Sequence, residues 1–151
     1  MDHWKQPYSL QYIIFIMMCV IGSSCQPKDT PPFIIEVVGE NYEWIIRYAG
    51  TDGLLHTADD KIGSGAIYAP ANSPVQIHLT SRDNLYFWFL NEFDQKGLAM
   101  IDREELLTFK TNGVGEFPVE ADQFCGFSHE SLHINFVVLE SEEFMQQIQK
   151  K

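Results

Sequence analysis

Two residues near the C-terminal end of the sequence have side chains suited to transition-metal chemistry. Cys125 is followed four positions later by His129. A thiolate and an imidazole are side chains that copper binds readily in proteins. Their spacing, after a region rich in aromatic and β-branched residues, is typical of a copper-binding loop. Cys125 and His129 are therefore the first candidates for metal ligands.

The N-terminal region resembles an export signal that ends at a lipid-attachment cysteine. The apolar run Tyr12–Gly22 is shorter than the ~20 residues that a spanning helix requires. Two serines then precede Cys25, as small residues do at a bacterial lipoprotein cleavage site. We expect residues 1–24 to be a signal peptide and Cys25 to be lipidated; a short uncleaved membrane anchor is the alternative. The proline-rich residues 25–32 would form a tether, and the domain would be extracytoplasmic.

This assignment leaves Cys125 as the only free thiol of the mature domain. An unpaired cysteine is unusual in an oxidising compartment. Metal ligation would explain it, and so would burial as a small hydrophobic side chain. The sequence leaves both explanations open.

The charge of the chain limits its partners. The formal net charge is −11, and no basic patch occurs along the sequence. An acidic domain repels nucleic acid and anionic membrane surfaces and could attract a basic protein. We therefore expect no nucleic-acid partner. Solubility alone is the alternative reason for the acidity.

The pattern of the chain after residue 32 predicts an all-β domain. Short aromatic and β-branched runs alternate with turn residues, as in a sandwich or barrel, and 151 residues suit one domain. Residues 51–65 are polar and rich in turn residues, which indicates an excursion loop, and Ser141–Gln149 has the cap and acidic first turn of a helix. The expected strands are Phe33–Gly39, Tyr42–Tyr48, Ala66–Pro70, Pro74–Thr80, Asn84–Leu90, Glu105–Lys110, Glu116–Val119 and Leu132–Leu139.

Five short motifs, in this order, resemble subunit II of cytochrome c oxidase. They are Gly39–Trp44, Tyr48–Gly53, Thr57–Asp60, Leu79–Asp83 and Gln123–Gly126. The similarity covers residues 33–147 and corresponds to the extracytoplasmic domain of that subunit. It implies a cupredoxin-like Greek-key β-sandwich with a short C-terminal helix, here preceded by the signal or anchor segment. In the family this domain carries the binuclear CuA centre, which takes electrons from cytochrome c and passes them to subunit I.

The resemblance also identifies which ligand positions of that centre are kept. The second cysteine and the second histidine correspond to Cys125 and His129, and the carbonyl ligand corresponds to Gln123. The first histidine, the first bridging cysteine and the methionine are replaced by Tyr86, Ala121 and Leu132. Two thiolates are needed to bridge two coppers, so the replacement of one by a methyl group predicts that no CuA centre forms.

Two functions follow from this pattern. The first is a copper-poor binding or structural module at the membrane surface, for which quinol oxidases, whose subunit II lacks CuA ligands, offer a precedent in the family. Its expected partners are an oxidase subunit I or a basic c-type cytochrome, although the chain lacks the two spanning helices of the family. The alternative is an electron-transfer protein that holds copper through Cys125 and His129, with His78 or His133 as uncertain further donors. Neither hypothesis includes a catalytic residue.

Three other patterns have simpler explanations. His129–His133 matches H-E-x-x-H, but that zinc motif requires a helix, and strand-forming residues follow it here. The carboxylates of Asp52, Asp59 and Asp60 do not have the spacing of a calcium-binding hand, which favours a solvated loop. An aromatic group resembles an electron-entry patch, but core packing is expected for about half of its members: Tyr42, Trp44, Tyr48, Tyr86, Phe87 and Trp88.

Overall fold

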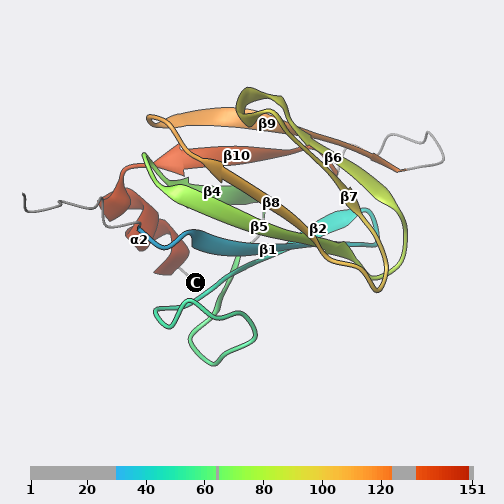
Figure 1. Cartoon of the computed structure of the whole chain (residues 1–151), viewed down its shortest axis with the longest axis horizontal. Coiled ribbons are helices and arrows are strands. Elements are labelled where there is room, and N and C mark those ends of the chain that lie inside the picture. Colours follow the sequence, from blue (N-terminus) through green and yellow to red (C-terminus); the bar gives the residue numbers. More distant parts are fainter. Residues whose placement is uncertain (1–29, 64, 124–131, 150–151) are drawn as a thin grey trace, which may run out of the picture.

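Two five-stranded sheets pack face to face in the computed structural model, and one short helix lies at one end of them (Figure 1). The structure describes residues 30–63, 65–123 and 132–149. This architecture confirms the predicted all-β sandwich with a C-terminal helix.

The first sheet has the strand order β3-β2-β1-β5-β8. Neighbouring strands are antiparallel except β1 and β5, which run parallel. Its strands are β1 (Phe33–Glu40), β2 (Glu43–Tyr48), β3 (Lys61–Gly63), β5 (Pro74–Ser81) and β8 (Glu105–Lys110).

The second sheet has the order β4-β10-β9-β6-β7, with β4 and β10 parallel. Its strands are β4 (Ala66–Pro70), β6 (Tyr86–Leu90), β7 (Gln95–Ala99), β9 (Gly115–Gln123) and β10 (Ile134–Leu139). The 3-10 turn η1 (Asn91–Phe93) joins β6 to β7, and helix α2 (Ser141–Gln149) follows β10.

Buried and more exposed side chains alternate along the strands, and the buried ones form the core between the sheets. In β5 every second residue from Val75 to Ser81 is buried, and in β6 the residues Tyr86, Trp88 and Leu90 are buried. Successive side chains of a strand point to opposite faces, so one face of each sheet is apolar and packs on the other sheet. Burial of these side chains is the main contribution to the stability of the fold.

Two strands were not predicted from the sequence. β3 lies within the expected loop 51–65, and β7 has the sequence Gln-Lys-Gly-Leu-Ala, which has little strand propensity. β7 forms because it pairs with β6, and because a side-chain oxygen of Glu105 accepts a hydrogen bond from the Leu98 N–H (2.8 Å). Three expected strands start later than predicted, at Glu43, Tyr86 and Ile134, and β9 extends to Gln123.

The sandwich has two distinct ends. β1 and β5 run in the same direction and finish beside the start of β6 and the finish of β9, an end that we call the ligand end. At the opposite end, the tether end, Thr30 precedes β1 and helix α2 packs near β4 (Figure 1). Among the described residues no helix has the length and apolar character needed to span a membrane.

Candidate metal centre

The fold brings the described ligand positions of the sequence prediction together at the ligand end. Tyr86 begins β6 and pairs with Gln123 on β9, while Ala121 pairs with Trp88 two residues further along the same ladder. Leu132 joins them through Trp44, whose indole N–H donates to the Leu132 carbonyl oxygen (2.9 Å) and whose ring lies 5.7 Å from that of Tyr86. The positions therefore converge in space, as the resemblance implied.

Tyr86 is fully buried, and its hydroxyl group is held by three partners. It donates to a carboxylate oxygen of Asp83 (2.8 Å). It accepts from the Tyr42 backbone N–H (3.3 Å) and from the side-chain amide of Asn84 (3.4 Å). The Tyr86 hydroxyl group thus has its hydrogen-bond partners within the protein, as expected of a buried polar group. It is not available as a ligand for a metal ion.

The protonation states at this end favour a neutral phenol beside a charged carboxylate. Burial raises the pKa of Tyr86 above its ordinary value, and the Asp83 carboxylate that accepts its proton raises it further. Burial alone would raise the pKa of Asp83, but hydrogen bonds from the Asn41 N–H (2.7 Å) and from Tyr86 lower it. A phenolate that could bind a metal is therefore disfavoured at neutral pH.

Apolar packing surrounds Tyr86. Ala121 and Leu132 are buried in the core, with exposed fractions of 1% and 0%. A Cβ atom added at Gly39 would lie 2.5 Å from the Tyr86 ring, so only glycine leaves room for this ring. Together with the phenol, the two hydrocarbon side chains offer no soft ligand for copper.

The retained ligand candidates lie at the edge of the described structure. Gln123 is the last residue of β9, and its side-chain amide donates to the side-chain oxygen of Asn84 (3.4 Å). Cys125 and His129 lie outside the described residues, as does Cys25. The prediction for these three residues therefore stays a prediction.

The other metal-binding candidates have protein partners. His78 points to the outer face of the first sheet, where Nδ1 contacts Glu104 (2.9 Å) and Nε2 contacts the Gln76 amide (3.0 Å). It lies on the side of β5 opposite to the core face, away from Tyr86. In the described segments, 30–63, 65–123 and 132–149, no group of three or more histidine, cysteine, aspartate or glutamate side chains could hold a metal ion.

The acidic excursion loop is closed by internal hydrogen bonds. Asp59 accepts from the N–H and hydroxyl groups of Thr51 and from the Thr57 hydroxyl, and hydrogen bonds from Thr57 and Thr51 lower its pKa to about 2. Asp60 accepts from the His56 N–H and from Arg47. These carboxylates organise the loop and pin it to Arg47 on β2.

Core packing accounts for most of the aromatic group. Trp44, Tyr48, Tyr86 and Trp88 are buried, whereas Tyr42 and Phe87 are partly exposed. Sequence reasoning missed Asp83, Asn84 and Gly39 as the residues that position Tyr86. The polar run from Ser81 to Asn84 immediately before a strand was the signal that could have found two of them.

No protein-family model matches the sequence. Cytochrome c oxidase subunit 2 of Thermostichus vulcanus is 29% identical over 127 residues, which cover 82% of this chain and 36% of the relative. The corresponding subunit of Synechocystis sp. is 26% identical over 124 residues, covering 82% and 35%. The chain thus spans about a third of the length of these curated relatives.

The fold has a counterpart among solved structures. The periplasmic domain of subunit II of cytochrome oxidase (CoxB) of Bradyrhizobium japonicum superposes with a TM-score of 0.65 at 19% identity, over 80% of this chain and 93% of that domain. The sandwich is thus of the cupredoxin-like class. These relatives and this structure confirm that the chain resembles the extracytoplasmic domain of cytochrome c oxidase subunit II.

Proposed function

We propose that this chain is a subunit II-like binding module at the extracytoplasmic membrane surface whose ligand end does not hold a binuclear copper centre. One observation carries the proposal: the side chain at the position of the first histidine ligand, Tyr86, is buried, and its hydroxyl group is bonded to Asp83, Asn84 and Tyr42. Ala121 replaces one of the two bridging thiolates, and with Cys125 alone two coppers cannot share two bridging sulfur ligands.

Attachment to the membrane belongs to the same proposal. Either a lipid on Cys25 or the apolar run Tyr12–Gly22 would hold the domain at the surface. The partner would be an oxidase subunit I or a basic c-type cytochrome. The resemblance to subunit II supports the first, and the net charge of −11 supports the second.

Copper reconstitution tests the proposal directly. The protein expressed with copper is expected to bind fewer than two copper ions per chain and to lack the purple absorption and delocalised EPR signal of a mixed-valence pair. Metal analysis, visible spectroscopy and EPR measure these properties. Two coppers per chain with that spectrum would refute the proposal.

A restored variant is the matched control. The triple substitution Tyr86→His, Ala121→Cys and Leu132→Met returns the three replaced ligands. It is expected to gain copper and the purple spectrum if Cys125 and His129 are competent ligands. The same experiment distinguishes the proposed function from the alternative. An intense thiolate–copper absorption in the unmodified protein, with one copper per chain, would favour electron transfer through Cys125 and His129.

A further inference from the structure

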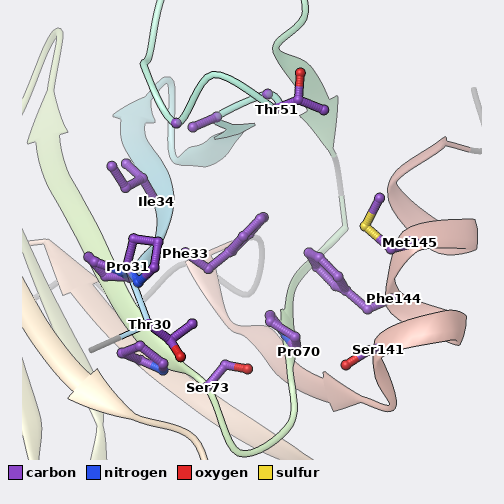
Figure 2. Close-up of a pocket in the computed structure, with 15 residues that line it drawn as sticks. Thr30, Pro31, Phe33, Ile34, Thr51, Pro70, Ser73, Ser141, Phe144 and Met145 are labelled. Atoms are coloured by element: carbon purple, nitrogen blue, oxygen red, sulfur yellow. The ribbon is translucent and has the colours of Figure 1, made fainter. Parts of the chain in front are cut away.

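A hollow of about 390 Å³ opens at the tether end of the sandwich, opposite to the ligand end. Its walls come from the start of β1, the segment after β2, the turn between β4 and β5, and helix α2 (Figure 2). Prolines, aromatic residues and hydroxyl groups line it. None of the described residues that line it carries a charge, which is unusual in a chain with a net charge of −11.

The base of this hollow is formed by packed aromatic rings, and an exposed methionine lies at its edge. Phe33 and Phe144 meet edge to face with ring centroids 4.8 Å apart, and Phe33 also packs against Tyr48 at 6.1 Å. Phe144 is 2% exposed, whereas the neighbouring Met145 is 45% exposed. Both side chains come from helix α2 (Figure 2). The hollow therefore combines a buried aromatic base with an adaptable thioether at its edge, a combination that suits an apolar occupant.

The position of the hollow places it close to the membrane. Thr30 lines it and is the first described residue after the N-terminal segment. Cys25 lies five residues before Thr30, and Gly22 lies eight residues before it. A fully extended chain spans at most 3.6 Å per residue, so the hollow lies within about 18 Å of a lipidated Cys25 or about 29 Å of an anchor that ends at Gly22. Either form of attachment holds this end at the bilayer surface.

We propose that this hollow is the docking site for an uncharged, apolar segment of an integral membrane protein. The inference rests on the membrane attachment proposed above and extends it by naming the surface that the partner contacts. A protein segment fits better than the lipid surface, because Glu142 and Glu143 are exposed beside the hollow in the first turn of α2 and would be repelled by anionic head groups. An apolar side chain entering the hollow would be buried among the aromatic rings and prolines, which favours association.

Site-specific photocrosslinking tests this docking site in the full chain within its own membranes. A benzophenone amino acid in place of Met145 is expected to crosslink to an extracytoplasmic segment of an integral membrane protein, identified by the mass of the crosslinked peptide. The same amino acid in place of Ile101, which is 50% exposed at the ligand end, is the control and is expected to give no such product. A product with lipid, a product with residues 1–29 of the chain itself, or equal products from both positions would overturn the inference.

A charge substitution provides a second measurement. Met145→Glu is expected to lower recovery of the crosslinked or co-purified membrane protein about tenfold, because a carboxylate would be buried without a partner. Met145→Leu is expected to retain recovery. Circular dichroism should show both variants folded, since the side chain is partly exposed; unchanged recovery with Met145→Glu would overturn the inference.

The membrane attachment is tested separately from the docking site, by washing the membranes. If washed membranes release the full chain, the attachment, and with it the proposed function, is wrong. If the chain stays on the membranes and Met145 crosslinks only to lipid, the attachment stands and the docking site is refuted.

Discussion

The two ends of the sandwich differ in how their space is filled. At the ligand end, the phenol of Tyr86, the methyl group of Ala121 and the side chain of Leu132 occupy a buried, hydrogen-bonded region. At the tether end, the rings of Phe33 and Phe144 lie at the base of an open hollow of about 390 Å³. The ligand end, which binds metal in the family that this chain resembles, is packed like a core. The tether end retains an open apolar surface.

The two ends therefore differ in packing: buried side chains fill the ligand end, whereas the tether end leaves an open hollow. Tight packing at the ligand end should make substitutions there costly to stability. Substitutions at the rim of the hollow should cost little stability, since the side chains there are partly exposed. Measurements of unfolding can therefore test the comparison without knowledge of any partner.

The largest effect is expected from Tyr86→Ala. Removing a fully buried aromatic side chain should lower the free energy of unfolding by about 3–5 kcal/mol, through lost burial and the cavity left behind. Urea denaturation followed by fluorescence measures it. A loss below about 1 kcal/mol would show that the ligand end is loosely packed and would break the comparison.

Gly39→Ala is expected to have the next largest effect. The added Cβ would lie 2.5 Å from the Tyr86 ring, so the ring must shift, at a cost of about 1–3 kcal/mol. The double variant Gly39→Ala with Tyr86→Ala provides the control, because the smaller side chain should relieve most of this cost. Additive losses in the double variant would contradict the packing explanation.

Tyr86→Phe separates the contribution of the hydrogen bonds to stability from the contribution of the ring. The ring stays in place, but Asp83 loses its shortest side-chain donor, and a loss of about 1–2 kcal/mol is expected. Thermal or urea unfolding at pH 7 measures it. An unchanged stability would mean that the phenol is not held in the way described.

Acid is expected to lower stability through the carboxylates whose pKa values are depressed. Asp83, Asp59 and Asp60 have lowered pKa values in the folded protein, about 2 for Asp59 against an ordinary value of 3.8. Groups of this kind stabilise the fold above the ordinary pKa and lose that contribution as the pH falls through the folded pKa. Unfolding free energies should therefore decline between about pH 5 and pH 2. Asp83→Asn should flatten this decline, and an identical pH profile in that variant would count against the role of Asp83.

The smallest effect is expected at the rim of the hollow. Met145→Ala removes a side chain that is 45% exposed, and the loss of unfolding free energy should not exceed about 0.5 kcal/mol. The same urea titrations as for Tyr86→Ala measure it. A loss as large as that of Tyr86→Ala would show that the two ends are packed alike.

Much of the fold could be predicted from local patterns. The β5 segment has alternating apolar residues, and the structure buries that side of the strand. β7 could not be predicted in this way, because its strand conformation comes from pairing with β6 and from the Glu105 side chain rather than from its own residues. Context of this kind overrides a weak local preference.

The candidate site was predictable in position but not in detail. The resemblance placed Tyr86, Ala121 and Leu132 at ligand positions, and the structure brings them together. The bonds that fix the Tyr86 phenol could not be read from the sequence, since the Tyr42 N–H comes from a segment 44 residues away. The hollow could not be predicted either, because it is formed by four segments that meet only in the folded chain.

Trp88, which is buried between the two sheets, offers a way to follow motions of the domain. Its side chain is fully buried, and its indole nitrogen has no hydrogen-bond acceptor among the described residues. Exchange of this proton with deuterium requires water to reach the interior, through local or global opening of the core. The Trp88 indole resonance should thus serve as a natural probe for opening of the core around it, observable by NMR without any added label on the side chain.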